Sequence, residues 1–170
     1  MNYILIGFKG AGKSTIGKAL SAAKKLPFID LDVVIEDIYS SSHSSSHERR
    51  TCRQIYQIHG EIFFRDLEAE ALRSLKAIDR SVIATGGGVL DRLENADALS
   101  SLGKIIYLDE EKEILRKRLS HEKIAFLAEE GSFEKLFNKR TANYNHTADL
   151  RISVSGKSQE QVVKEIMQVI

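Results

Sequence analysis

The sequence feature that most constrains the fold is a glycine-rich segment close to the start of the chain. It runs Gly7-Phe8-Lys9-Gly10-Ala11-Gly12-Lys13-Ser14-Thr15 and contains the pattern Gly-x-x-x-x-Gly-Lys-Ser. An apolar run, 2–6, comes before it and a helical pattern follows it. Such a strand–turn–helix unit is a P-loop, in which backbone N–H groups and the helix dipole hold phosphate oxygens. The sequence therefore predicts a nucleoside triphosphate site.

The P-loop also suggests roles for individual residues. The amino group of Lys13 can reach the β- and γ-phosphates, and the hydroxyl of Ser14 can ligate Mg²⁺. Glycines leave room for the backbone to turn around the phosphates. The residues expected to contact the nucleotide are Gly10, Ala11, Gly12, Lys13, Ser14 and Thr15.

The overall composition narrows the class of protein. The length of 170 residues favours a single domain, 1–170, and the formal net charge of +1 gives no strong attraction to nucleic acid or to a membrane. The single cysteine, Cys52, excludes an internal disulfide and suits a reducing compartment. The chain has no apolar run of the ~18 residues that span a bilayer, and its start lacks the pattern of a signal peptide. We therefore expect a cytoplasmic protein with neither nucleic acid nor membrane as a partner.

Apolar segments alternate with helical patterns along the chain. We expect strands at 2–7, 27–30, 81–84, 104–108 and 150–154. We expect helices at 13–25, 33–39, 61–76, 90–99, 110–119, 133–145 and 159–170, and one more between Thr51 and Gly60. This alternation predicts a parallel sheet with helices on both faces, a three-layer α/β/α fold. Ligands bind at the carboxyl ends of such strands, where this chain has 7–14, 30–32 and 85–88.

Two carboxylates follow the second expected strand. Asp30 and Asp32 can hold Mg²⁺, and one of them could accept a proton from an attacking hydroxyl. The structural alternative is that Asp32 caps the helix from Val33. Because the pair lies in the same sheet as a P-loop, we favour the functional interpretation.

Two arginines and a glycine triplet are further candidates. Arg65 lies beside Phe63 and Phe64 and needs an anionic partner, which is either Glu68 in a salt bridge or a ligand carboxylate. The triplet Gly86-Gly87-Gly88 exposes bare backbone to a small polar ligand, and it also suits a tight turn. Arg140 follows a polar segment, 120–132, that resembles a lid.

Two other patterns in the sequence also have simpler interpretations. The strand that ends in Asp109-Glu110 matches the Walker B pattern of ATPases, but we favour Asp109 as the N-cap of the next helix. His43 and His47 have a metal-binding spacing, but they lie in the serine-rich segment 40–50 and are interpreted as part of a solvated loop.

Five motifs, taken in order, make the chain resemble the shikimate kinase family over nearly its whole length. The resemblance implies a nucleoside-monophosphate-kinase fold, α/β with a five-stranded parallel sheet in the order 2-3-1-4-5 and a lid. It also implies transfer of the γ-phosphoryl group of ATP to the 3-hydroxyl of shikimate, in chorismate and aromatic amino acid biosynthesis. The motifs are the P-loop, Asp30-Leu31-Asp32-Val33-Val34-Ile35-Glu36, Gly60-Glu61 with Phe64-Arg65 and Glu68, Gly86-Gly87-Gly88, and Lys139-Arg140 with Tyr144.

The resemblance also implies a role for each site residue. Lys13 would stabilise the transferred phosphoryl group, and Asp32 would bind the substrate hydroxyls and act as the base. Ser14 and Asp30 would hold Mg²⁺. The residues implied for the shikimate carboxylate and its surroundings are Arg65, Arg140, Gly86, Gly87 and Gly88. Those implied for ATP beyond the P-loop are Lys123, either Arg116 or Lys117 before the lid, and Lys157 after the last strand, and the family expectation is a monomer.

The chain departs from the family pattern in two places. The family's lid carries Arg-Pro-Leu-Leu, whereas this chain has Lys123-Ile124-Ala125-Phe126-Leu127, so a lysine stands where an arginine is expected. Residues 40–50 look like an insertion within the substrate-binding region of about 33–80, which would be either a flexible decoration or a gate of the cleft. The alternatives kept open are a kinase of another hydroxy acid such as gluconate, an ATPase or switch using Asp109 and Glu110, and a nucleotide-binding protein without activity.

Overall fold

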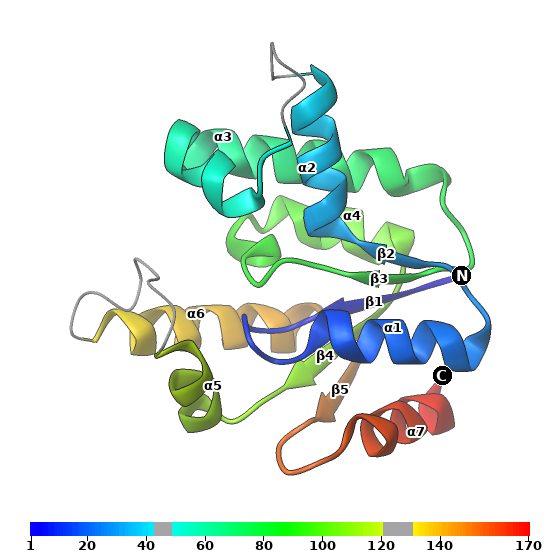
Figure 1. Ribbon diagram of the computed structural model, residues 1–170. Coiled ribbons are helices and arrows are strands. Elements are labelled where there is room, and N and C mark those ends of the chain that lie inside the picture. The colour runs from blue at the N-terminus through cyan, green and yellow to red at the C-terminus, as the bar shows by residue number, and fades with distance from the viewer. Residues whose placement is uncertain (43–48, 121–130) are drawn as a thin grey trace.

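Five parallel strands form one sheet in the order β2-β3-β1-β4-β5 (Figure 1). The computed structural model describes residues 1–42, 49–120 and 131–170. This strand order is the one that the family resemblance implies, so the expected fold is confirmed. The strands are β1 (Asn2–Ile6), β2 (Phe28–Asp30), β3 (Val82–Ala84), β4 (Gly103–Asp109) and β5 (Leu150–Ser153).

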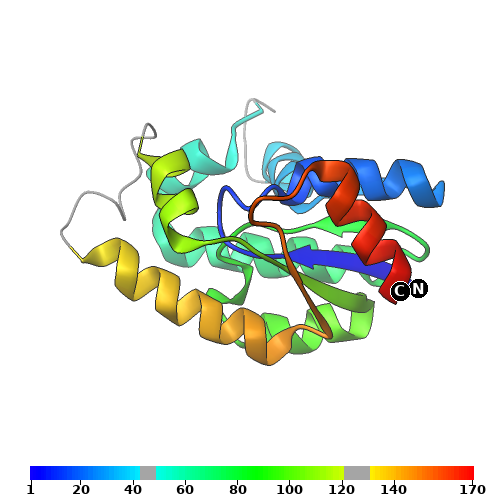
Figure 2. The same ribbon diagram turned by 90° about the horizontal axis from the view of Figure 1, so that it is seen from below.

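Helices cover both faces of the sheet, as Figures 1 and 2 show from two directions. The two helices on one face enclose the smaller apolar core, in which Leu5 of β1 packs with Leu20 and Ile166. The neighbouring residues Ile4 and Ile6 point into the larger core on the other face. The first face has α1 (Lys13–Lys24) and α7 (Gln159–Val169), and the larger core takes side chains from α2 (Leu31–Ser42), α3 (Cys52–Ser74), α4 (Glu94–Leu102), α5 (Lys112–Leu119) and α6 (Ser132–Thr147).

Helix α3 contains the break that the sequence predicts. Gly60 has φ 81° and ψ 179°, so it is not helical and it divides α3 into two helical segments. Thr51 caps the first segment in a capping box with Gln54. A short 3₁₀ helix, η1 (Leu75–Ala77), follows the second segment.

Three expected helix starts are wrong. The helix expected from residue 33 begins at Leu31, directly after β2. The helix expected from residue 90 begins at Glu94, because the residues before it form the 3₁₀ turn η2 (Val89–Asp91), whose Val89 carbonyl accepts a hydrogen bond of 2.8 Å from the Asn95 side chain. The helix expected from residue 110 begins at Lys112, and Glu111, not Asp109, is its N-cap residue. The carboxylate of Asp109 instead accepts hydrogen bonds from Tyr107, at 2.8 Å, and from Arg151, at 2.7 and 3.0 Å. Asp109 is therefore bound by Tyr107 and by a residue 42 positions later, and it does not cap the helix.

Three predicted features lie wholly or partly outside the described residues. His43 and His47 of the insertion 40–50 are among the residues that the structure does not describe, and so are Lys123 and most of the lid segment 120–132. The described flank of the insertion includes Arg49, whose guanidinium lies 3.2 Å from the Asp37 carboxylate of α2. The region of about 33–80, which is predicted to bind the substrate, includes most of α2 and all of α3.

Both termini lie at one end of the sheet. In Figures 1 and 2 the markers N and C lie near each other, because β1 starts there and α7 runs back to the same end. The P-loop leaves β1 at the opposite end, where the carboxyl ends of the parallel strands meet.

Candidate active site

The P-loop is folded around its own lysine. Gly10 and Gly12 both have φ 87°, which only glycine adopts readily, and Gly12 is the N-cap residue of α1. The ammonium group of Lys13 donates to the carbonyl oxygens of Gly7, at 2.8 Å, and of Phe8, at 2.9 Å. The lysine is therefore held inside the loop that would receive the phosphates.

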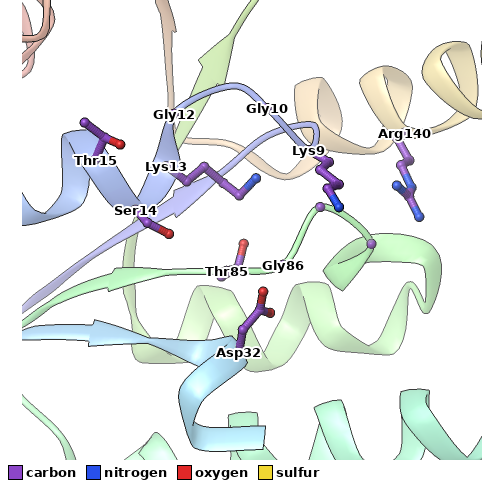
Figure 3. A pocket seen from close by; sticks show the side chains of 12 residues that line it. Lys9, Gly10, Gly12, Lys13, Ser14, Thr15, Asp32, Thr85, Gly86 and Arg140 are labelled. Atoms are coloured by element: carbon purple, nitrogen blue, oxygen red, sulfur yellow. The ribbon is translucent and has the colours of Figure 1, made fainter. Parts of the chain in front are cut away.

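A cavity of about 450 Å³ opens at the carboxyl ends of the strands, and Figure 3 shows how its side chains face one another. We call it the main cavity. It brings together most of the residues that the sequence analysis selected. It is lined by Lys9, Gly10, Gly12, Lys13, Ser14, Thr15, Asp32, Thr85, Gly86, Gly87, Gly88 and Arg140.

Lys13 and Asp32 shift each other's protonation across this cavity. Burial lowers the pKa of the Lys13 ammonium to about 8, although the charge of Asp32 acts in the opposite direction. Burial, and then the charge of Asp30, raise the pKa of the Asp32 carboxyl, which Lys13 lowers. A carboxylate whose pKa is raised is a stronger base, so Asp32 suits proton abstraction from a hydroxyl.

For the ATP-dependent reaction that the resemblance implies, these shifts predict a bell-shaped pH profile for kcat/KM with ATP as the varied substrate. Lys13 attracts phosphate only while it is protonated, so kcat/KM should fall above about pH 8, the pKa to which burial lowers the ammonium. On the acid side it should fall at a higher pH than for an ordinary aspartate, because the Asp32 pKa is raised. Initial rates measured from pH 5 to 11 would test this. An alkaline limb above pH 10, as for an ordinary lysine, would contradict it.

Ser14 and Asp30 offer oxygen ligands side by side. The hydroxyl of Ser14 donates to Oδ2 of Asp30 at 2.8 Å. The Asp30 Oδ1 atom accepts the backbone N–H of Asp32 at 3.2 Å, so Asp30, not Asp32, caps the start of α2. The capping role considered for Asp32 is therefore wrong, and its side chain faces the main cavity. A hydroxyl beside a carboxylate is a donor set that fits Mg²⁺.

Each glycine of the triplet makes room for a different site residue. A Cβ atom on Gly86 would lie 3.1 Å from Oδ1 of Asp32, and one on Gly87 would lie 2.8 Å from the backbone N of Lys9. A Cβ atom on Gly88 would lie 2.3 Å from Nη2 of Arg65. The triplet is therefore required for the close approach of α2, the P-loop and α3.

The two arginines meet at one carboxylate that the sequence analysis did not select. Arg140 lines the main cavity, whereas Arg65 lies against Gly88 and is not among the lining residues of the described chain. Arg65 forms the salt bridge with Glu68 that the sequence suggested, at 2.8 Å. Both arginines also bind Asp91, at 3.0 Å from Arg65 and 2.6 Å from Arg140.

Comparison with known proteins decides the family. The family model described as shikimate kinase matches residues 9–170. The chain belongs to the shikimate kinase family. Shikimate kinase of Alkaliphilus oremlandii is 34% identical over 98% of this chain and 96% of the relative, and that of Geobacter sulfurreducens is 37% identical over 97% and 88%.

Solved structures agree with this assignment. Shikimate kinase from Aquifex aeolicus matches with a TM-score of 0.84 and 32% identity over 99% of this chain and 95% of that chain. Shikimate kinase from Acinetobacter baumannii in complex with shikimate matches with a TM-score of 0.86 and 27% identity over 99% and 91%. A gluconokinase from Sinorhizobium meliloti, with 17% identity and a TM-score of 0.55, shares the fold alone. Membership confirms the expected activity, ATP-dependent phosphorylation of shikimate, and so makes the chain a transferase of the shikimate pathway.

The Walker B alternative does not fit this family member. In a Walker B site the aspartate accompanies the P-loop serine at the metal. Here Ser14 bonds to Asp30, while Asp109 bonds to Arg151. Glu110 is buried, and its carboxylate lies 2.9 Å from Arg118 and accepts from Ser155 at 2.6 Å. Asp109 and Glu110 therefore bind other side chains, and the carboxylate that contacts the P-loop serine is that of Asp30.

A second cavity of about 200 Å³ shares Gly12 and Thr15 with the main cavity. It includes Ala11 and Lys157, which were selected from the sequence, together with Arg118, whose guanidinium donates to the Gly10 carbonyl at 2.7 Å. Arg116 contacts Glu134 and Phe133 of α6 and lines neither cavity in the described chain. Its role at ATP stays a prediction, and Lys123 lies outside the described residues.

Three residues of the site were missed by the sequence analysis. Lys9 and Thr85 line the main cavity, and Asp91 joins the arginines. Lys9 lies inside the P-loop pattern at a position that accepts any residue, so its charge alone could have drawn attention to it. Asp91 gives no signal in the sequence, because its partners are 26 and 49 residues away.

Proposed function

We propose that this protein carries out its kinase reaction in the main cavity, on the 3-hydroxyl of shikimate, with the residue roles given below. The observation that carries this proposal is the placement of Lys13 and Asp32 on one cavity, with Arg140 in its wall (Figure 3). Lys13 belongs to the part of the site that would bind ATP, which we call the donor half. Asp32 and Arg140 belong to the part that would bind the phosphoryl acceptor, which we call the acceptor half. Phosphoryl transfer requires both halves within reach because the group passes directly between them.

The reaction forms one O–P bond and breaks another. The shikimate hydroxyl oxygen attacks the γ-phosphorus of ATP, the bond to the β-phosphate oxygen breaks, and the hydroxyl proton moves to the Asp32 carboxylate. Lys13 would leave its two carbonyl partners and neutralise charge on the phosphoryl oxygens. The backbone N–H groups of the P-loop and the N-terminus of α1 would hold the remaining phosphates.

We also propose that Mg²⁺ is the metal cofactor. Ser14 and Asp30 are the residues that would hold it, because their oxygen atoms lie 2.8 Å apart beside the P-loop. The bound ion would supply positive charge to the β- and γ-phosphates.

The acceptor half has the chemistry of a carboxylate site. The guanidinium of Arg140 lines the main cavity and provides bidentate donors for a substrate carboxylate. Two contacts hold the backbone of Gly87 in place. Its carbonyl accepts a hydrogen bond from the hydroxyl of Tyr144, and its Cα lies against Lys9. Its N–H group, with those of Gly86 and Gly88, is proposed to assist at the substrate.

A coupled assay of ADP release tests the proposal. Mg·ATP would be supplied alone and then with shikimate, gluconate or a nucleoside monophosphate. We expect ADP release with shikimate, and rates near the background with the other acceptors. Equal release with and without every acceptor would instead favour an ATPase, and nucleotide binding without any release would favour an inactive relative.

The surroundings of the reaction are also proposals. We propose a cytoplasmic monomer with ATP and shikimate as its partners and with neither nucleic acid nor membrane. The net charge of +1 and the single cysteine support this. Among the described residues, no helix combines the length and the apolar character needed to cross a membrane.

Replacing Asp109 with Asn should leave kcat within about twofold of the wild type. The fold should also persist, because a partly exposed ion pair contributes at most about 1 kcal/mol to stability. The change removes part of the contact with Arg151 and does not touch the main cavity. The matched change Asp30→Asn should raise the Mg²⁺ concentration needed for half-maximal rate. Rates of both variants against Mg²⁺ concentration would decide. A collapse in the rate of a folded Asp109→Asn protein would restore the Walker B assignment.

A further inference from the structure

The carboxylate of Asp91 bridges the two arginines of the acceptor half. Its Oδ2 atom lies 2.6 Å from Nη2 of Arg140 and 3.0 Å from Nη2 of Arg65, and its Oδ1 atom accepts from Nε of Arg140 at 3.0 Å. All three side chains are only 10% exposed. These are charge-assisted bonds in a place largely shielded from water, where they are stronger than on a surface.

The backbone that carries Asp91 is also held in place. Its N–H group donates to the Gly88 carbonyl at 2.9 Å, which closes the turn η2 directly after the glycine triplet. The carbonyls of Val89 and Leu90 accept side-chain hydrogen bonds from Asn95, at 2.8 Å, and Asn143, at 3.0 Å. The carboxylate is therefore fixed relative to both the triplet and α6, the helix of Arg140.

Asp91 also balances charge. Arg65 is held by Glu68 on one side and by Asp91 on the other, and although burial lowers its pKa, these two carboxylates raise it overall, so the guanidinium remains charged. A second guanidinium this close would repel it if no carboxylate stood between them. Asp91 thus allows both cations to occupy one buried corner of the site.

Arg140 lines the main cavity and contacts Asp91 through one edge of its guanidinium. Asp91 takes the edge formed by Nε and Nη2. A guanidinium has a second bidentate edge, formed by its two Nη atoms, which can bind another carboxylate. A substrate that displaced Asp91 would leave a carboxylate nine-tenths buried without its partners, which is strongly unfavourable. The contacts therefore favour an Asp91 that stays bound to Arg140 when the substrate binds, and not one that the substrate displaces.

We propose that Asp91 is a positioning residue that orients Arg140, and through Arg65 the glycine triplet, for the carboxylate of the substrate. The proposal rests on the function proposed above. Asp91 itself would contact neither substrate nor nucleotide. It makes recognition of the acidic acceptor depend on a residue outside the motifs of the sequence.

The test is the Asp91→Asn variant, which keeps the size of the side chain and removes its charge. We expect KM for shikimate to rise about tenfold or more, because Arg140 loses its fixed orientation. The values of kcat and of KM for ATP should stay within about twofold, since the donor half is untouched. The methyl ester of shikimate, which lacks the negative charge, should have nearly the same KM in both proteins.

Controls separate positioning from general damage. Asp66→Asn removes an exposed carboxylate that lies 2.6 Å from Arg92, the residue next to Asp91, and should change none of these constants. Thermal unfolding of each variant reports on folding. If Asp91→Asn does not fold, Asp91→Glu replaces it, and the displaced carboxylate should raise KM for shikimate by a smaller factor.

Three outcomes would overturn the proposal. KM for shikimate could be unchanged, it could fall, which would mean that Asp91 competes with the substrate for the arginines, or it could rise equally for the methyl ester. The wild-type protein, measured in parallel, tests the proposed function separately. Wild-type activity with shikimate, together with an unaffected variant, would refute only the role of Asp91.

Discussion

Replacing Asp32 with Asn is expected to lower kcat about 10³-fold, within the range of general acid–base catalysis. The amide keeps the shape of the side chain and cannot accept the hydroxyl proton. KM for ATP should change little, because the P-loop is intact. Steady-state rates with shikimate and ATP varied in turn would measure both quantities.

The matched control is Asp37→Asn on the same helix. Asp37 is exposed and pairs with Arg49 away from the main cavity, so this variant should retain wild-type kinetics. If the Asp32→Asn protein kept near-normal kcat, the base would have to be another group or solvent, and the assignment of Asp32 would be wrong.

Replacing Lys13 with Met is expected to have a comparable effect on kcat, about 10³-fold, because it removes the cation that we propose neutralises charge on the transferred group. It should also weaken ATP binding, which the Asp32 variant should not do. The buried position of Lys13 suits a methionine of similar length, so the fold should persist. Nucleotide titration and initial rates would give the two effects separately.

Lys18→Met provides the comparison for this variant. Lys18 lies exposed on α1, one turn after Lys13, with its ammonium over the ring of Phe28. Its replacement should leave ATP binding and kcat unchanged. Equal losses in both variants would indicate damage to α1 and not the loss of a catalytic cation.

The parts of the fold that depend on local patterns could be predicted from the sequence. The P-loop glycines, the apolar strands and the break at Gly60 each result from residues close in the chain, and the structure has all of them. Asp32 could be chosen because it comes directly after a strand in the same sheet as the P-loop. Membership in a known family then supplied the order of the strands, which local patterns do not determine.

The parts that depend on distant partners could not be predicted in this way. The local sequence predicts Asp109 as a helix cap, but its carboxylate binds Arg151, 42 residues later in the chain. Arg65 was expected at the substrate. Its guanidinium lies against Gly88, and one of its N–H donors binds Asp91. Side-chain networks of this kind arise from packing between helices, which no single segment of sequence describes.

The position of the two termini has a practical consequence. Because Met1 and Ile170 lie at the end of the sheet away from the main cavity, a tether attached to either one leads away from the opening. The enzyme could therefore be fixed to a sensor surface or fused to a reporter domain with its substrate entrance facing solution. Binding of small ligands could then be followed on the attached protein without obstruction by the support.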